Sequence, residues 1–159
     1  MINYVNKEII YNGCPGCAYA RHEFELPCGI AYEDERFILS QDWEIPIEGF
    51  FIVSLKRHVE RISDLTEDER NELFNIAVKT IGILKTNNVC DEFDIFLEDK
   101  NDNHLHLWVL PIYDWMSNLA GKDMNNLGTV IDYAKENFSN EETYERIKNI
   151  TELVKNNYK

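Results

Sequence analysis

Two histidines that stand one residue apart are the residues of this chain best suited to chemistry. His104 and His106 occur in the stretch NDNHLHLWVLP (101–111), where polar and apolar residues alternate and Trp108 takes the next alternate position. Successive side chains of a strand point to opposite faces of a sheet, so these three would share one face while the leucines between them face a core. On that face the histidines could act in catalysis, bind a metal or simply be solvated.

A pair of cysteines near the N-terminus adds a second group of reactive side chains. Cys14 and Cys17 form CPGC, whose two-residue gap suits a zinc knuckle or a redox pair. A proline soon afterwards cuts short the helix that a thioredoxin-type motif would open, so we favour a metal. Two histidines would complete a tetrahedral zinc site. His58 and a histidine at the start of the HLHLW strand could supply them, but from spacing alone His22 is a rival.

Length and composition restrict the class of protein. The chain has 159 residues, 44% of them hydrophobic and 12% aromatic, which is typical of one globular domain with a core. Its net charge of -13 weighs against nucleic acid as a partner, although a small phosphorylated ligand needs only one local anion-binding spot. The sequence has no apolar stretch near 20 residues and no signal-peptide pattern. We therefore expect a cytoplasmic protein without a membrane partner.

The elements that must position these side chains follow from hydrophobic periodicity. Alternating and apolar runs predict two hairpins and a central strand. Their residues are 30–33 with 37–41, 50–55, and 94–98 with 104–112. Helical periodicity predicts two C-terminal helices, at residues 129–138 and 141–157. The sum is an α+β fold: a mostly antiparallel sheet of five strands, one long helix packed on it and a C-terminal helical extension.

The long helix has the clearest local signals. TEDE predicts a capping box between Thr66 and Glu69, and Asn87 with Asn88 should end the helix. Its expected apolar face consists of Leu73, Phe74, Ala77, Ile81 and Leu84.

The order of the motifs resembles the histidine triad (HIT) superfamily of nucleotide hydrolases and transferases. The matching segments are CPGC, then YEDERFILSQDWEIPIEGFFIVSLKRHVERISDLTEDE, then HLHLWVLP, and they extend from about residue 14 to residue 111. The H-φ-H core alone would be weak evidence, where φ is a hydrophobic residue. Its combination with CPGC and KRH, in this order and spacing, carries the resemblance.

The resemblance implies a role for particular residues. His106 falls on the middle histidine, the nucleophile that attacks an α-phosphate and forms a nucleotidyl-histidine intermediate. Asp42 falls on the acidic residue that binds ribose hydroxyls; the other reading is a plain surface residue at a strand end. Trp43 could cover a nucleobase, and Trp108 would border the substrate, although tryptophans at such positions are more often packing residues. Zinc-bearing bacterial members bind structural zinc through the positions of Cys14, Cys17, His58 and His104 here, not through His22.

The chain also departs from the family pattern. Trp108 replaces the third histidine, and Phe50 stands where many members have another active-site histidine. The polar element that usually touches phosphate is replaced by the shorter KNDN, and Ile112 stands where a proline–arginine pair is common. Transferase relatives that replace the third histidine by glutamine still react through the middle one.

The sequence therefore predicts a HIT-like domain over residues 1–115, including the zinc knuckle, and a helical extension over residues 116–159. The implied function is a nucleotide phosphohydrolase or nucleotidyltransferase acting on a nucleoside phosphate or dinucleoside polyphosphate. The alternative is a zinc-stabilised nucleotide-binding module with little or no turnover, and a redox protein using CPGC is a third hypothesis. By resemblance we expect a homodimer.

Overall fold

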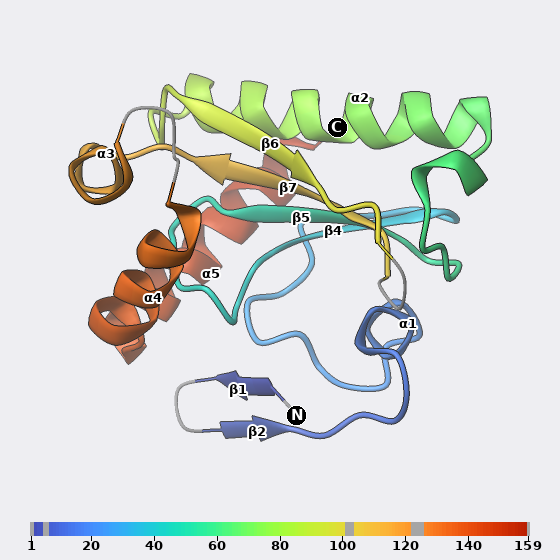
Figure 1. Cartoon of the computed structure of the whole chain (residues 1–159), viewed down its shortest axis with the longest axis horizontal. Helices are drawn as coiled ribbons and strands as arrows, with labels where there is room; N and C mark the ends of the chain where they lie inside the picture. Colours follow the sequence, from blue (N-terminus) through green and yellow to red (C-terminus); the bar gives the residue numbers. More distant parts are fainter. Residues whose placement is uncertain (1, 5–6, 101–103, 122–125, 159) are drawn as a thin grey trace.

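A five-stranded antiparallel sheet forms the centre of the fold (Figure 1). The computed structural model describes residues 2–4, 7–100, 104–121 and 126–158. The strands lie in the order β3-β4-β5-β7-β6. Their bounds are β3 Tyr32–Glu33, β4 Phe37–Gln41, β5 Phe51–Leu55, β6 Phe93–Leu97 and β7 His106–Pro111. The predicted α+β class is confirmed, and so is the central place of the apolar strand β5.

Both predicted hairpins are present in the sheet. β3 pairs with β4, and β6 pairs with β7, each antiparallel. Residues 101–103, which belong to the predicted KNDN connection, lie outside the described residues. The register places Ser54 of β5 opposite His106 and Ile52 opposite Trp108. One sheet face therefore carries the histidine and the tryptophan in consecutive rows.

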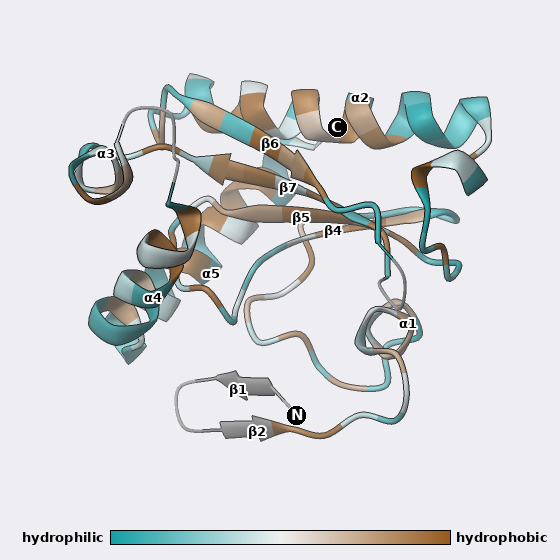
Figure 2. Cartoon of the chain, viewed as in Figure 1, coloured by the Kyte–Doolittle hydropathy of each residue, from teal (hydrophilic) through white to brown (hydrophobic). Residues whose placement is uncertain are grey.

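Helix α2 (Glu67–Thr86) covers the other face, where it packs on the alternate residues of β7. Its capping box is complete, with Thr66 accepting from the Glu69 N–H and Glu69 accepting from the Thr66 N–H. Leu105, Leu107 and Val109 are fully buried in the same core cluster as the inner side of α2. Figure 2 shows the hydrophobic strands lying beneath this helix.

The prediction that Phe74 belongs to the buried face of α2 is wrong. Phe74 is 46% exposed, whereas its neighbour Leu73 is fully buried. The buried residues of α2 follow the period Leu73, Ile76, Ala77, Thr80, Leu84. Phe74 lies next to that stripe but outside it, because each residue turns about 100° around a helix axis.

Short elements lie against the histidine-bearing face. They are α1 (Pro15–Ala20), α3 (Asp114–Ala120) and α4 (Leu127–Phe138), with a separate hairpin of β1 (Ile2–Tyr4) and β2 (Lys7–Ile9) below them (Figure 1). A single turn, η1 (Ile62–Asp64), precedes α2. The sequence did not predict α1, α3 or the β1–β2 hairpin, because three to seven residues are too few to establish a period.

Helix α5 (Glu141–Asn157) joins the two layers. It contacts both α2 and β4, and its end carries Val154 into the core cluster under α2. Nearer its start, the Tyr144 hydroxyl donates to the Trp43 carbonyl at 2.7 Å, on the opposite side of the sheet. The predicted helices at 129–138 and 141–157 are confirmed, α4 beginning two residues earlier. The division of the chain at residues 115 and 116 stays a prediction.

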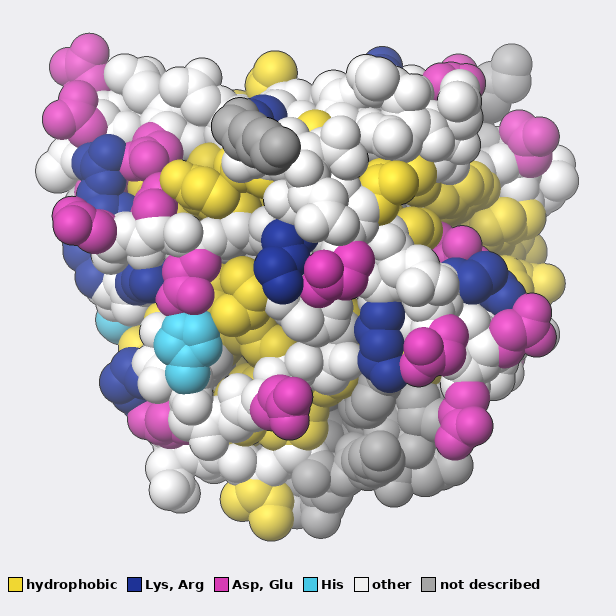
Figure 3. Space-filling model, turned by 180° about the vertical axis from the view of Figure 1, so that it is seen from behind, with side chains coloured by type: hydrophobic (Ala, Val, Ile, Leu, Met, Phe, Trp, Pro, Cys, Tyr) yellow, Lys and Arg dark blue, Asp and Glu magenta, His cyan; other side chains and the backbone are white. Residues whose placement is uncertain are grey.

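One face of the molecule carries side chains of both charges around hydrophobic areas (Figure 3). On the face drawn in Figure 3, acidic side chains are interspersed with lysine and arginine side chains. In the part of the chain that the structure describes, no helix is both long and apolar enough to cross a membrane.

Candidate metal centre and ligand cavity

Four side chains from three separate segments converge beside α1. Cys14, Cys17, His58 and His104 each offer one ligand atom, and these four atoms all lie within 4.8 Å of one another. The structure thus brings together the residues to which the resemblance assigned a metal.

The distances within this cluster test whether the donor set fits one ion. The Nδ1 atom of His104 lies 3.5 Å from the sulfur of Cys14 and 3.6 Å from that of Cys17. The Nδ1 atom of His58 lies 3.4 Å from the sulfur of Cys17. Around a tetrahedral zinc, with Zn–S bonds of about 2.3 Å and Zn–N bonds of about 2.0–2.1 Å, sulfur and nitrogen ligands stand about 3.6 Å apart. The cluster therefore has both the chemistry and the spacing of a structural Cys2His2 zinc site.

Hydrogen bonds hold both histidines in the orientation that a metal needs. The Nε2 atom of His104 lies 2.8 Å from the Leu55 carbonyl, which can only accept, so Nε2 carries the proton and Nδ1 keeps its lone pair. Burial lowers the pKa of His104 and thereby favours the neutral imidazole that binds metals. His58 turns its Nε2 toward Glu60 Oε1 at 3.4 Å and also presents Nδ1 to the thiols.

Local backbone structure explains how α1 reaches the sheet. Cys14 is the N-cap of α1, and its sulfur accepts from the Cys17 N–H at 3.5 Å. A Cβ atom on Gly16 would lie 2.3 Å from Cγ of His104, so only glycine allows this approach. The Leu105 N–H donates to the Val59 carbonyl at 2.7 Å, which ties the strand start to the segment that carries His58.

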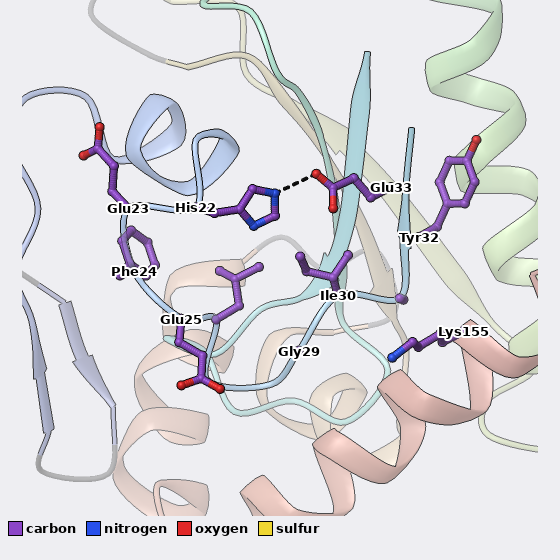
Figure 4. A pocket seen from close by; sticks show the side chains of 11 residues that line it. His22, Glu23, Phe24, Glu25, Gly29, Ile30, Tyr32, Glu33 and Lys155 are labelled. Carbon is purple, nitrogen blue, oxygen red and sulfur yellow. Dashed lines mark hydrogen bonds and ion pairs between the residues drawn. The ribbon is translucent and has the colours of Figure 1, made fainter. Parts of the chain in front are cut away.

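His22, the rival ligand, belongs to a different place. Figure 4 shows its ring pointing across a second cavity toward Glu33, and its Nε2 lies 2.7 Å from Glu33 Oε1. That cavity measures about 820 Å³ and is bordered by the segment that follows α1, by β3 and by Lys155 of α5. The compact C-x2-C-x4-H spacing is therefore not used within the four-residue cluster.

A cavity of about 740 Å³ adjoins the cluster on the histidine-bearing face. This volume is within the range of small-molecule sites. Strands contribute Ser40, Ile52, Ser54, His106 and Trp108 to its lining, and the turn after β4 contributes Asp42, Trp43, Glu44 and Ile45. The other walls are α1, the segment around residues 58–60, and α4, so the cavity joins the zinc-type cluster to the C-terminal helices.

His106 sits in this cavity with a defined tautomer. Its Nδ1 lies 2.7 Å from the His104 carbonyl oxygen, an acceptor, so Nδ1 carries the proton and Nε2 keeps the lone pair. An imidazole held in this state presents a neutral nitrogen nucleophile. His106 is the first residue of β7, and His104 of the cluster lies two residues before it.

Asp42 is buried, so its interpretation as a plain surface residue is wrong. It is 7% exposed and lines the cavity. Its Oδ1 accepts from the Glu44 and Ile45 N–H groups at 2.7 and 2.8 Å, which fixes the turn after β4. Burial raises the pKa of Asp42 to about 6, against the opposing effect of those two hydrogen bonds.

Two of the positions that depart from the family pattern, Phe50 and Trp108, pack on each other. The rings of Phe50 and Trp108 meet edge to face with centroids 5.2 Å apart, and Trp108 lies 5.9 Å from the His106 ring. Both aromatic side chains join an apolar cluster with Leu110 and the inner sides of α3 and α4. His106 therefore borders an apolar wall on this side.

Trp43 lies on the other side of the cavity within a separate aromatic group. It stacks on Tyr19 at a centroid distance of 5.7 Å and meets Phe24 edge to face at 6.1 Å. The indole N–H groups of Trp43 and Trp108 are both buried and have no hydrogen-bond partner among the described residues.

The sequence missed several residues that line the cavity. Tyr11, Tyr19 and Phe24 come from the N-terminal segment, and Ile131 and Lys135 come from α4. Periodicity gives no signal that such distant segments meet. The helices after residue 115 were expected only as an extension packed on the domain, without a part in the site. Lys135 nevertheless makes an ion pair with Glu44 at the cavity, with Nζ and Oε1 3.5 Å apart.

Comparisons with known proteins agree with the motifs and the sheet. No family model matches the chain. Over 95 residues it is 27% identical to an uncharacterized HIT-like protein of Methanocaldococcus jannaschii, an alignment that covers 57% of this chain and 73% of that protein. A Zn-bound histidine triad family protein from Mycobacterium smegmatis superposes with a TM-score of 0.62 and 17% identity over 91% of this chain and 96% of the other. A hypothetical histidine triad nucleotide-binding protein from Sulfolobus tokodaii superposes with a TM-score of 0.60 and 23% identity, over 90% of this chain and 93% of that one.

The fold and the cluster together define the class of protein: the chain has the histidine triad fold, and the resemblance predicted from its motifs is confirmed. Within that fold, the chain carries a Cys2His2 cluster, and Trp108 stands at the third position of the triad pattern.

Proposed function

We propose that the chain binds a nucleoside phosphate in the cavity beside the Cys2His2 cluster and that His106 attacks its α-phosphate. The observation that carries this proposal is the hydrogen bond from His106 Nδ1 to the His104 carbonyl, which leaves Nε2 with its lone pair at the cavity. The histidine triad fold and the nucleotide-binding description of the Sulfolobus tokodaii protein support a nucleotide as the ligand.

The proposed reaction has two steps. Nε2 forms a bond to the α-phosphorus while the bond from phosphorus to the leaving oxygen or nitrogen breaks, and the leaving group takes up a proton. Water or another acceptor then attacks the phosphorus of the nucleotidyl-histidine, loses a proton and frees the imidazole. The Nδ1 hydrogen bond to a backbone carbonyl stabilises the imidazole while Nε2 is substituted.

Zinc is proposed to bind at Cys14, Cys17, His58 and His104. Four protein ligands fill a tetrahedral coordination sphere, so the ion would contribute order and not an activated water. This order reaches His106, because His104 is both a ligand and the residue whose carbonyl accepts from His106.

The charges that line the cavity favour one class of nucleoside phosphate over another. Asp42, Glu44 and Glu60 are acidic, and Lys135 is the one lysine or arginine among the described lining residues. A dinucleoside polyphosphate would bring several negative charges into this acidic space. We therefore propose a nucleoside monophosphate ester or phosphoramidate with an uncharged or cationic leaving group.

A binding module without turnover is the second candidate. Phe50 and Trp108 favour it, because an apolar edge-to-face pair takes the place of two groups that would carry protons or contact phosphate. Asp42 would serve either candidate, since the hydrogen bonds of its Oδ1 leave Oδ2 for sugar hydroxyls.

Mass spectrometry of the intact protein separates these candidates. Wild type is incubated briefly with adenosine and guanosine phosphoramidates and polyphosphates and quenched in alkali, which preserves phosphoramidates. We expect a mass increase of one nucleoside monophosphate, absent in His106→Ala and retained in His22→Ala, the control histidine of the second cavity. Binding of a nucleotide without an adduct or turnover in wild type would favour the binding module.

A homodimer is also proposed. β6 is an outer strand of the sheet. Among the described residues no strand pairs with its outer edge, and Ile95 is 38% exposed, so a second copy could pair there. Sedimentation analysis should give a dimer for wild type and a shift toward monomer for Ile95→Lys. A wild-type monomer at micromolar concentration would exclude this assembly.

A further inference from the structure

We propose that the cavity selects guanine as the base of its ligand through Glu44 and Lys135. This inference rests on the proposed function, since it requires a nucleotide in the cavity. The acidic side chain comes from the turn after β4, and the basic one comes from α4.

Glu44 and Lys135 lie where a base would be expected if Asp42 binds the ribose. Asp42 is the proposed ribose-binding residue, and a base is attached directly to its ribose. The cavity-lining residues that follow Asp42 in the chain are Trp43, Glu44 and Ile45, and α4 faces them with Ile131 and Lys135. Glu44 and Lys135 are the charged side chains of this group, and the distance between Nζ and Oε1 is 3.5 Å.

The pair is complementary to the edge of guanine. Guanine presents the O6 acceptor beside the N1–H and N2–H donors. A carboxylate can accept two of these N–H groups at once, while an ammonium donates to O6, and such charge-assisted hydrogen bonds are the strong ones. Adenine offers only the N6 amino group to the carboxylate and an acceptor at N1, so one contact is lost.

The two side chains are free to make these contacts. Glu44 is 54% and Lys135 41% exposed, and an ion pair of that length and exposure is weak, so a base can part it at little cost. Trp43 lines the cavity beside Glu44, and its indole is held by Tyr19 and Phe24, so it offers a fixed aromatic surface next to the base.

The test compares three monophosphates by isothermal titration calorimetry with the full chain. We expect guanosine 5′-monophosphate to bind roughly tenfold more tightly than adenosine 5′-monophosphate. Inosine 5′-monophosphate, which lacks the N2 amino group, should fall between them. Glu44→Gln and Lys135→Met should each bring the guanosine-to-adenosine ratio close to one.

A matched ion pair outside the cavity provides the control. Lys155 and Glu152 of α5 pair at 3.2 Å with similar exposure, so Glu152→Gln and Lys155→Met should keep the guanosine preference. Equal affinity of wild type for the three nucleotides would overturn the inference and leave the proposed function standing. A preference that survives in both Glu44→Gln and Lys135→Met would overturn the inference as well. If none of the three nucleotides binds, both the inference and the proposed function are overturned.

Discussion

The two ends of the ligand cavity differ in how their side chains are held. At the α1 end, His104 and His106 are both fixed by hydrogen bonds to backbone carbonyls, and their free nitrogens point at the thiols and at the cavity. At the α4 end, Phe50 and Trp108 are held by ring contacts, and the Trp108 N–H has no partner among the described residues. One strand, β7, runs through both ends.

The two kinds of contact differ in how much substitution they tolerate. A tautomer set by a carbonyl survives only if the backbone stays in register, so the polar end depends on the cluster that anchors α1 to β7. Apolar packing tolerates changes of side chain much better. Two departures from the HIT pattern, Phe50 and Trp108, lie at the tolerant end, where the site also meets the C-terminal helices.

The largest expected effect concerns the anchor of the polar end. Cys14→Ser should abolish bound zinc and lower the free energy of unfolding by more than about 3 kcal/mol, because metal binding is linked to folding. His22→Ala should keep zinc, since His22 pairs with Glu33 in the second cavity. Metal analysis and denaturant unfolding measure both variants. Zinc retained in the first, or lost in the second, would contradict the assigned ligands.

The next effect tests the buried carboxylate between the two ends. The folded pKa of Asp42 is about 6, above the ordinary 3.8, so the folded protein binds the proton more tightly than the unfolded chain. The free energy of unfolding should therefore fall as pH rises from about 4 to about 6, by about 3 kcal/mol from this group.

Asp42→Asn should remove this pH-dependent loss, because the amide oxygen can still accept from the Glu44 and Ile45 N–H groups without a buried charge. The measurement is the difference in unfolding free energy between wild type and variant at several pH values, with zinc in excess throughout. A difference that is constant with pH would show that Asp42 ionises normally.

A smaller effect distinguishes close packing at the polar end from ordinary helix propensity. Gly16→Ala should cost about 1–3 kcal/mol and weaken zinc binding, because its Cβ would overlap the His104 ring. Gly82→Ala in α2 meets no atom within 4 Å and should instead stabilise by up to about 1 kcal/mol. Thermal unfolding and zinc titration of the two variants give the comparison. Zinc affinity should fall in Gly16→Ala and stay unchanged in Gly82→Ala. An unchanged zinc affinity in Gly16→Ala would contradict the close approach of α1 to His104.

The smallest effect is expected at the apolar end. Trp108→Phe removes an N–H without a partner but also leaves a gap, so the two contributions offset and stability should change by less than about 1 kcal/mol. Its neighbour Leu107, fully buried on the opposite face, should cost about 2–5 kcal/mol on truncation to alanine. Urea unfolding measures both. A loss of similar size in Trp108→Phe would mean that the indole N–H has a structural role.

The sequence predicts the features that have a local period and misses those that do not. The strands, the capping box of α2 and the shared face of His104, His106 and Trp108 follow from local periods of two and 3.6 residues. Phe74 shows the limit, since it adjoins the buried stripe of α2 but lies outside it. The short helix α3 was missed because one or two turns contain no repeated period.

By itself, the sequence determined the elements, their order and the candidate residues, because side-chain alternation and capping act between residues close in the chain. Spacing along the chain left His22 and His58 as alternatives, because it does not say which loop returns to α1. The resemblance favoured His58, and the tertiary structure places His58 in the cluster and His22 beside Glu33. Only the tertiary structure decided that Lys135 of α4 meets Glu44 across the cavity. Such contacts join segments about 40 to 90 residues apart, and they form because burying apolar faces brings those segments together, not because of any local preference.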